Sequence, residues 1–534
     1  MKQIAYIIIA AVALTLSPSY AQAQSSSAKK MTQAVFDVYD KMLREDPNDY
    51  EIWLRRANEY YTRNEYMRAL NDVDQALKLI PASDKDSRQQ AYMLRANIYE
   101  QTGRHRQALD DLNSLVAIAP DSYVAIYQRA NANFELGEYA SAKADYQRLQ
   151  RLNSRSTEAL IGLARVAVKE NNLGLANEYL DQAVNTDPNN ASLYVRRASV
   201  RRLMGTNRSA VDDLIVALAV DSHNSRATKD LIDLAAVDYP TVIEGLTEAM
   251  RQAPNVGMYV YLRAFISQAH YRYTAALADY KDILDRNLYN YHGIYASMAE
   301  CLYGLGRYDE ALARVDKSIS MDRNNAAHHV LRSKILRALE RYEDAKTDAA
   351  AALAIKKSDV DALSQLALCY VSLKNYREAA NLFGEAALDH PELPMIAVNR
   401  AWVLGTYLNE PVAADGFYRS ILDMTTYGED DVRSLRGFAL LFGGQREQAL
   451  EWARNIAATA NDGEGRVSYL LACLYAQADD VDSALAAVET ALSHGYADYH
   501  DWTEADDSRI NVAPIRDDLR FLHLLDKYKA IFGR

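Results

Sequence analysis

Side chains that could act in catalysis or bind a metal are few and scattered in this chain of 534 residues. His328 and His329 are neighbours, and successive helical residues point about 100° apart, so the two do not face one metal ion. Acidic stretches at 429–431 and 505–507 are typical of solvated turns. The sequence has no glycine-rich phosphate loop, no paired cysteines at metal spacing and no nucleophile motif. We therefore expect no enzymatic activity, no metal site and no cofactor.

A regular pattern of arginine and aspartate is more informative. Arginine recurs at one position of a repeated segment, and aspartate follows 16 residues later in six copies. An arginine on a mostly buried face needs a partner, so we infer a salt bridge between the two positions. An alternative is a row of arginines for an anionic ligand, although the aspartates would neutralise it. The inferred pairs are Arg56–Asp72, Arg95–Asp111, Arg129–Asp145, Arg197–Asp213, Arg263–Asp279 and Arg332–Asp348.

Copies that lack the arginine also lack the aspartate, which supports the pairing. They have Leu163 with Tyr179, Met298 with Arg314, Leu366 with Leu382, and Leu471 with Ala487. Arg400 and Arg436 differ, because Gly416 and Trp452 stand where the aspartate would be. We expect these two arginines to pair elsewhere or to face a bound partner. Arg436 and Trp452 are candidates for a cation–π contact.

The charges belong to a unit that recurs with a period of about 34 residues. In the segment from Tyr50, the residues Trp53, Ala57 and Tyr60 follow the i, i+4, i+7 spacing of one helix face. A short turn and a second apolar stripe from Ala69 follow, so the unit is helix, turn, helix. The repeating alanines mark where the two helices approach closely. They are Ala69, Ala108, Ala142, Ala176, Ala210, Ala276, Ala311, Ala345, Ala379, Ala413, Ala449 and Ala484.

This unit resembles the tetratricopeptide repeat, whose pattern is an aromatic, a small residue, Tyr, Gly, Tyr, Ala, an aromatic, Ala and Pro. The segments 123–156 and 360–393 match it well, and a degenerate copy with Tyr239-Pro240 in a tight turn lies near 223–256. The resemblance implies an all-α, right-handed α–α superhelix of about thirteen helix-turn-helix repeats with terminal capping helices. It also implies that the chain binds protein or peptide partners.

The first residues have the pattern of a secretion signal. Lys2 precedes an apolar run at 4–16 that is too short to span a bilayer comfortably, and Ala21-Gln22-Ala23 is a small-x-small cleavage site. An uncleaved anchor helix is the alternative. We expect an exported protein, periplasmic or else secreted, with no membrane span in the mature chain. Cys301, Cys369 and Cys473 lie in different repeats, so we expect them to be unpaired.

The ends of the array predict the domain boundaries. Residues 32–47 form an amphipathic pattern that would cover the first repeat, and an apolar segment from Ile515 resembles a terminal cap. We expect a signal peptide at 1–23, a disordered linker and N-terminal capping helix at 24–49, the solenoid at 50–498 and a C-terminal capping segment at 499–534. The net charge of −12 argues against a nucleic-acid surface.

Partner-binding positions follow from the resemblance, since the first helices of this family line a concave groove. In the first three repeats these positions hold Leu54, Asn58, Tyr61; Met93, Asn97, Glu100; and Tyr127, Asn131, Phe134. The three asparagines occupy equivalent places and suit hydrogen bonds to an extended peptide backbone. An ordinary solvated helix surface is the alternative.

Two further surfaces are candidates for binding. Arg165, Lys169, Arg196, Arg201 and Arg202 form a local basic patch for an acidic segment, with scattered surface charge as the alternative. Tyr261, Phe265 and Tyr303 form an aromatic section after the degenerate repeat.

The function that these observations favour is a non-enzymatic scaffold or adaptor that binds protein or peptide in the bacterial cell envelope. The alternative is an accessory subunit that binds envelope glycan such as peptidoglycan. The sequence does not determine the oligomeric state.

Overall fold

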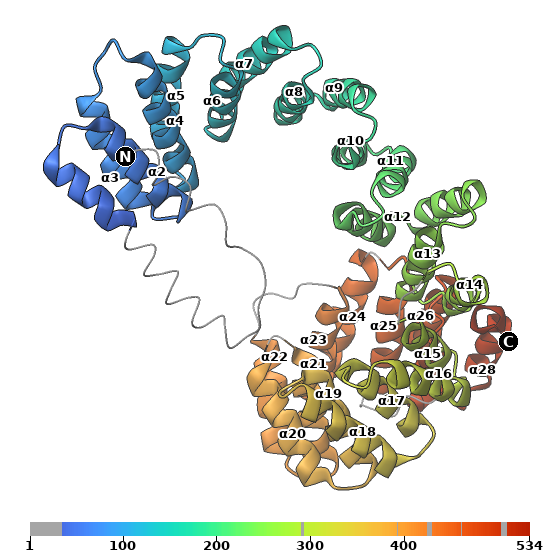
Figure 1. Cartoon of the computed structure of the whole chain (residues 1–534). Coiled ribbons are helices and arrows are strands. Elements are labelled where there is room, and N and C mark those ends of the chain that lie inside the picture. The colour runs from blue at the N-terminus through green and yellow to red at the C-terminus, as the bar shows by residue number, and fades with distance from the viewer. Residues whose placement is uncertain are drawn as a thin grey trace. The chain divides into compact units, whose positions relative to one another are not determined.

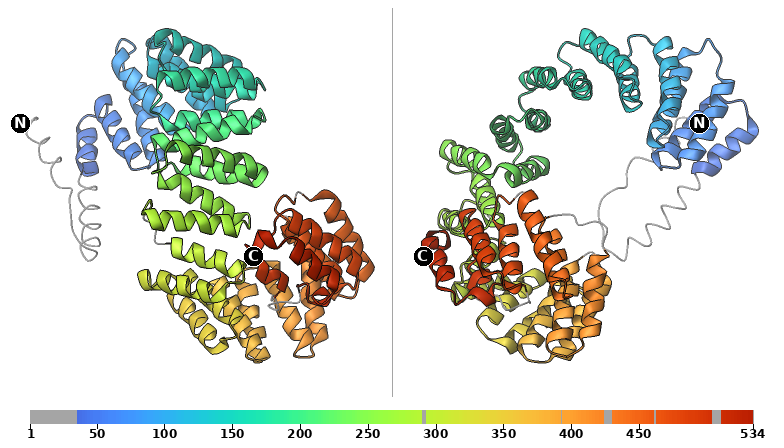
Figure 2. Two further views of the ribbon diagram at one scale, coloured as in Figure 1. Left: turned by 90° about the vertical axis from the view of Figure 1, so that its right-hand side faces the viewer. Right: turned by 180° about the vertical axis from the view of Figure 1, so that it is seen from behind.

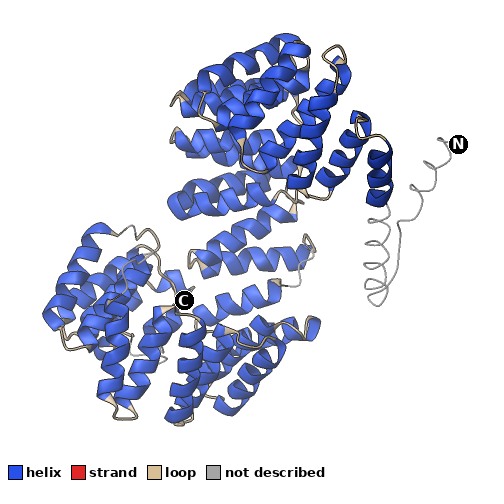
Figure 3. Cartoon of the chain, turned by 90° about the vertical axis from the view of Figure 1, so that its left-hand side faces the viewer, coloured by secondary structure: helices blue, strands red, loops and turns tan. Residues whose placement is uncertain are grey.

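The computed structural model describes residues 35–289, 293–391, 393–423, 430–460, 462–503 and 510–533. Every regular element within these ranges is a helix (Figure 3). The helices belong to two compact units, of which unit 1 ends at Asp221 and unit 2 begins at Ser222. The predicted signal peptide lies outside the described residues.

Unit 1 is a series of helix pairs, and the two helices of each pair pack against each other and against the next pair along the chain (Figure 1). The side chains of Asp49, Ser122 and Ser156 accept hydrogen bonds from backbone N–H groups of the following helix and so fix where it begins. The helices are α2 Tyr50–Thr62, α3 Tyr66–Leu79, α4 Lys85–Gln101, α5 His105–Ile118, α6 Tyr123–Glu135, α7 Tyr139–Leu152, α8 Thr157–Lys169, α9 Leu173–Thr186, α10 Ala191–Leu203 and α11 Asn207–Val220.

Unit 2 continues the same pattern. Its first helix is the degenerate repeat, in which two helices join without a loop at the non-helical Asp238, just before Pro240. The helices are α12 Ser225–Gln252, α13 Gly257–Ala269, α14 Tyr273–Arg286, α15 Ile294–Gly304, α16 Tyr308–Met321, α17 Ala326–Ala338, α18 Tyr342–Ile355, α19 Val360–Ser372, α20 Tyr376–Asp389, α21 Pro394–Thr406, α22 Pro411–Leu422, α23 Asp430–Phe442, α24 Arg446–Thr459, α25 Arg466–Gln477, α26 Val481–Ser493, α27 Tyr499–Thr503, η2 Ala513–Ile515, α28 Leu519–Lys527 and η3 Lys529–Phe532.

The predicted all-α repeat fold is confirmed, with thirteen helix pairs from α2 to α26 when the two halves of α12 count as one pair. The small residues lie where the helices cross, since Ala57 and Ala69 are both fully buried. The turn between these helices needs a left-handed residue, and Asn64 supplies it with φ of 61°. The Glu65 N–H then donates to the Tyr60 carbonyl at 2.9 Å and closes the end of α2.

A helix over residues 35–45 precedes the first repeat and covers it, as the amphipathic pattern predicted. Phe36 stacks on Tyr60 with ring centroids 4.3 Å apart, and Leu43 is buried. Asp40 on this helix forms an ion pair with Arg56. At the other end of the array, α28 packs against α26 and buries Phe521.

All six predicted arginine–aspartate pairs are present, each with two hydrogen bonds. In the third repeat, Arg129 donates from Nε and Nη2 to the two carboxylate oxygens of Asp145 at 2.9 and 2.6 Å. The other five have the same two-point geometry. Burial raises the pKa of the Asp72, Asp111 and Asp213 carboxyls, and the arginine hydrogen bonds work in the opposite direction. The aspartates are therefore enclosed, and their charge depends on the arginine.

Each of these arginines also makes a contact that the pairing rule did not predict. The remaining Nη1 group reaches a polar side chain on the preceding second helix, so one guanidinium joins three helices in succession. The acceptors are Asp40 for Arg56, Asp74 for Arg95, Asn113 for Arg129, Asp181 for Arg197, Thr247 for Arg263 and Asp316 for Arg332. The salt bridges therefore link neighbouring repeats as well as the two helices within a repeat.

Arg400 and Arg436 find aromatic partners instead. The Arg436 guanidinium lies 5.3 Å from the Trp452 ring, which confirms the predicted cation–π contact, and Nη1 donates to the Leu422 carbonyl at 2.7 Å. Arg400 lies 4.6 Å from the Phe417 ring. Gly384 leaves the space that Arg400 occupies, because a Cβ there would come within 2.7 Å of the guanidinium.

In unit 2 the end of the chain contacts earlier repeats, which no spacing within a repeat predicts. Arg272, just before α14, donates to the carbonyl of Gly495 and, at 2.5 Å, to that of His494. The imidazole of His500 lies 2.8 Å from the Tyr308 hydroxyl, and η3 packs against α14. Figure 2 shows α25–α28, in red, beside the pale green α13–α16.

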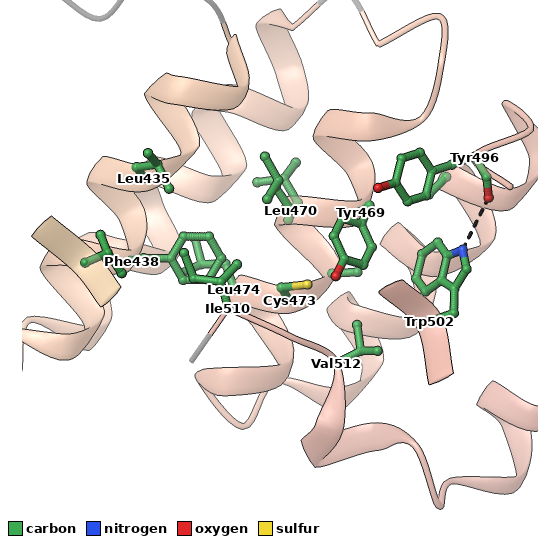
Figure 4. Packing of buried hydrophobic residues seen from close by; sticks show 14 of the residues in the cluster. Leu435, Phe438, Tyr469, Leu470, Cys473, Leu474, Tyr496, Trp502, Ile510 and Val512 are labelled. Carbon is green, nitrogen blue, oxygen red and sulfur yellow. Dashed lines mark hydrogen bonds between the residues drawn. The ribbon is translucent and has the colours of Figure 1, made fainter. Parts of the chain in front are cut away.

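A dense apolar core supports the contacts between the end of the chain and these earlier repeats, which we call the closure of unit 2. Trp502 is fully buried, and its indole N–H donates to the Tyr496 carbonyl at 3.2 Å (Figure 4). Tyr469 stacks on Tyr496 with centroids 5.0 Å apart, and Cys473 lies beside Tyr469. Cys473, Cys301 and Cys369 are buried free thiols, as their separation along the array predicted.

Asp498 lies at the edge of this core, between the last repeat and α14. Its carboxylate accepts from the Tyr273 hydroxyl at 3.4 Å and from the Asp501 N–H at 3.3 Å. Burial, and then the neighbouring Asp501 carboxylate, raise the pKa of Asp498 well above its usual value, while Arg466 acts in the opposite direction. The closed unit therefore favours the protonated acid.

The three-helix bridge can be tested in the third repeat. Arg129→Ala and Asp145→Ala should each lower the local opening free energy by about 3 kcal/mol, because each leaves a buried charge without its partner. The double variant should lose much less than the sum of both losses. Asn113→Ala removes only the contact to the preceding repeat and should cost about 1 kcal/mol. Hydrogen exchange of α6 and α7 in the full chain measures these values, and additive losses would show that the pair is not coupled.

Asp498 should give unit 2 a specific pH dependence. Because the folded chain holds the Asp498 proton more tightly than the unfolded chain, stability should fall as pH rises above the ordinary aspartate range. Asp498→Asn should remove that component and raise the thermal midpoint of unit 2 at pH 8 more than at pH 5. A midpoint that falls at both pH values would mean that the ionised carboxylate stabilises the closure.

Candidate peptide-binding groove

A hollow of about 1080 Å³ lies on unit 1 between the first helices of the first two repeats. Five of the residues predicted from groove positions line it, namely Leu54, Asn58, Tyr61, Met93 and Asn97. On α2 the spacing of 54, 58 and 61 places the three side chains on one face. That face differs from the one on which Ala57 meets Ala69, so the helix packs on one side and remains open on the other.

The hollow combines an apolar floor with amide groups. Leu54 is buried, and Met93 and Leu94 are half-buried beside it. Asn58 is exposed, whereas the Asn97 amide oxygen accepts from Gln128 Nε2 at 2.9 Å. An amide both donates and accepts, so this surface suits the alternating N–H and C=O groups of an extended chain laid over apolar pockets.

Charged side chains occupy the rim of the hollow. Glu51 is 63% exposed and forms an ion pair with Arg55 at 3.4 Å. Glu59 forms an ion pair with Arg63 on the same helix. The hollow is therefore lined by two carboxylates and one arginine, with the amides and apolar groups between them.

Sequence reasoning missed several lining residues. Tyr39 belongs to the helix over 35–45, and Ser87 and Gln90 come from the first turns of α4. The helix α4 has 17 residues where most first helices have 13, and its additional turn extends the wall. The unusually long insertion between Ala69 and Ala108 was the signal for that turn.

The predicted groove residues of the third repeat, Tyr127, Asn131 and Phe134, are less accessible than we expected. Phe134 is 8% exposed and lies under the Arg165 guanidinium, 4.0 Å from its ring centroid. Asn131 is half-buried, and its amide oxygen accepts from the hydroxyl of the buried Tyr146 at 2.6 Å. Tyr127 packs edge-on against Tyr146. The asparagine at this position joins the two helices of its own repeat and does not line the hollow.

Two of the five side chains of the predicted basic patch form ion pairs. Arg165 pairs with Glu135 at 2.8 Å, and Arg201 pairs with Asp213 at 2.9 Å. Lys169 and Arg196 are exposed. Arg202 is half-buried and, within the described ranges, has no ion pair. Carboxylates of the repeats thus offset part of the positive charge of this patch.

The aromatic section in unit 2 is divided. Phe265 is 37% exposed and stacks near Tyr261, whose ring also contacts Tyr289 at 5.1 Å. Tyr303 instead contacts His500, with centroids 4.8 Å apart. It lines a hollow of about 350 Å³ that first-helix residues share with the C-terminal segment. Its walls include Tyr303, Lys334, Arg337, Leu368, Trp402, His500 and Arg516. In unit 2 the chain's own end therefore occupies part of the face that is open in unit 1.

The neighbouring His328 and His329 have structural partners among the described residues. Within the described ranges, no three His, Cys, Asp or Glu side chains come together as a metal site requires. His328 contacts Ser318, and His329 contacts Asp348 at 3.0 Å, so the two rings have separate structural partners. Among the helices that the structure describes, none has both the length and the apolar character needed to cross a bilayer. The expectation that the chain has no catalytic activity stays a prediction.

Comparison with known proteins agrees with the repeat geometry. The family model described as "Tetratricopeptide repeat" matches residues 54–123, 127–191 and 330–394. These stretches fall on helix pairs of both units. Tetratricopeptide repeats are therefore present in this chain, and proteins that contain them bind protein or peptide partners.

Individual relatives are distant and match in part. A DnaJ homolog subfamily C member 7 homolog from Schizosaccharomyces pombe is 23% identical over 60% of this chain and 66% of its own length. Cellulose synthase operon protein C from Pseudomonas fluorescens is 26% identical over 35% of this chain and 15% of its own length. Human mitochondrial import receptor subunit TOM34 is 27% identical over 22% and 40%. The chain thus spans less than two thirds of each of these relatives.

Two solved structures match this chain with low TM-scores. Yeast Tom70 is 16% identical, with a TM-score of 0.39 over 90% of this chain and 95% of that one. The protein YrrB is 22% identical, with a TM-score of 0.30 over 36% of this chain and 96% of that one.

Proposed function

We propose that this chain is a non-enzymatic adaptor that binds an extended segment of a partner protein in the unit 1 groove. The observation that carries the proposal is the hollow of about 1080 Å³ lined by first-helix residues of two successive repeats. Its apolar floor offers side-chain pockets, and its amides offer hydrogen bonds to a peptide backbone. Adaptor activity also agrees with the tetratricopeptide repeats, which as a class bind proteins.

We further propose that the adaptor works in the bacterial cell envelope, with the periplasm as the compartment. The support is Lys2, the apolar run at 4–16 and the Ala21-Gln22-Ala23 cleavage pattern. Buried free thiols and salt bridges between helices make the fold independent of disulfides, so it suits either redox environment.

The groove is tested by changing two of its lining residues, the exposed Asn58 and the half-buried Tyr61. Asn58→Ala and Tyr61→Ala should weaken capture of a protein partner from envelope extract by about fivefold to tenfold each, because each removes one ligand contact. Asn71→Ala is the control for Asn58→Ala, since Asn71 is also exposed but lies on α3, outside the hollow. The variants should keep the thermal midpoint of the parent chain. Capture that survives both groove changes would exclude this site.

The same assay separates the adaptor from a glycan-binding subunit. Isolated peptidoglycan should not compete with the captured protein for the parent chain. Competition by peptidoglycan, together with no protein captured, would favour the glycan-binding alternative.

Export is tested by expression of the full chain in a bacterium with two membranes. The periplasmic fraction should contain a mature form that begins near Gln24, as N-terminal sequencing can establish. Ala23→Arg should block cleavage and retain the longer form in the membrane, because signal peptidase needs a small residue there. A full-length chain in the cytosol would contradict the proposal.

A further inference from the structure

Two polar side chains beyond the hollow, Glu100 and Gln128, each have a buried oxygen that accepts no hydrogen bond from the described residues. Glu100 follows Asn97 by one turn on α4 and lies on the same face. Its Oε2 is 2.9 Å from His105 Nδ1, whereas its Oε1 is buried and has no hydrogen-bond partner in the described chain. Gln128 donates to Asn97 through Nε2, and its own Oε1 is likewise buried without a donor. Two acceptors from adjacent repeats are therefore left without a donor within the described ranges, one on a residue that contacts Asn97 and one on a residue a turn beyond Asn97.

A buried acceptor without a donor costs free energy, which a ligand recovers if it supplies the donor. A lysine ammonium has three donors and no acceptor, and an arginine guanidinium has five. A carboxylate would bring only acceptors and would meet the negative charge of Glu100. The chemistry of these two groups thus selects a cation.

The hollow itself contains two carboxylates, Glu51 and Glu59, which pair with Arg55 and Arg63. Tyr39 and Tyr61 add aromatic surface, on which the stem or charge of a long basic side chain can rest. A basic residue therefore finds carboxylates both within the hollow and one turn beyond it.

We propose that the partner segment carries a lysine or arginine whose cation binds beside Glu100 and Gln128. This rests on the proposed function of the unit 1 groove and adds the chemical class of its ligand. The backbone of the segment lies along Asn58 and Asn97, and its apolar side chains rest on Leu54 and Met93. The terminal torsions of Glu100 and Gln128 are soft, so both oxygens can turn toward the bound cation.

The test uses the full chain and peptide libraries that are random except for one fixed central residue, which is Lys, Arg, Gln or Glu. The Lys and Arg libraries should bind about tenfold more tightly than the Gln library, in line with a charge-assisted hydrogen bond. Their advantage should shrink as salt rises. Glu100→Gln should remove most of the advantage of the Lys and Arg libraries over the Gln library.

Two variants keep the result interpretable. Asp110→Asn makes the same charge change at an exposed site on α5 and should leave the preference intact. Glu100→Lys should shift the preference toward the Glu library. Equal binding of all libraries with no effect of Glu100→Gln would overturn the inference and leave the peptide-binding groove standing. No binding of any library would overturn the inference and also contradict the proposed function.

Discussion

The whole array depends on how closely two helices can approach within each repeat. Ala57 and Ala69 meet with no exposed surface, and a larger side chain at either place would force the helices apart. Close helices leave little room for water, so the arginine and aspartate beside them must satisfy each other. The two-point geometry of Arg129 on Asp145 meets that demand, because the planar guanidinium fork matches a carboxylate. Small residues thus create the condition under which the salt bridges become structural.

The two units use the same repeat in different ways. In unit 1, helix pairs contact their neighbours along the chain, and the first-helix face keeps a hollow between α2 and α4. In unit 2, Arg272 and Tyr308 hold the segment around His494 and His500, so the end of the chain packs on repeats more than 190 residues earlier. A contact of that sequence separation makes several repeats cooperative, whereas nearest-neighbour stacking leaves each one to open with its own stability.

The sequence predicted the structural features that depend on a single repeat, but it did not predict contacts between side chains of different repeats. The helix-turn-helix unit, the six arginine–aspartate pairs and the Arg436–Trp452 contact all follow from fixed spacing inside a unit, and all are present. Of the groove positions, Leu54, Asn58 and Met93 line a hollow. Phe134 is buried because Arg165 of the next repeat lies over it. Spacing within one unit contains no information about such a neighbour.

The closure of unit 2 could not be predicted from the sequence, for a related reason. Asp498 and His500 lie beyond the last repeat, and Arg272 occupies the place before a second helix that Arg307 and Arg341 also hold. Nothing in their local sequence identifies partners more than 190 residues away. The contact of Arg129 with Asn113 would have been easier to predict, because the second helix of the preceding repeat has a polar residue 16 positions before the arginine. We call this position the matching place. Only the geometry of stacked repeats reveals that this place faces the next arginine.

That matching place has a consequence for how such an array can change. Asp74, Asn113, Asp181 and Asp316 each stand before a repeat that has the arginine. Repeats without the arginine follow either kind of residue, since Asp282 stands before Met298 and Ala350 stands before Leu366. The junction therefore restricts the order of the repeats in one direction only. A gene rearrangement that placed a repeat with the arginine–aspartate pair after Ala350 would lose the third contact of the guanidinium, whereas a repeat without the arginine could follow either kind of helix.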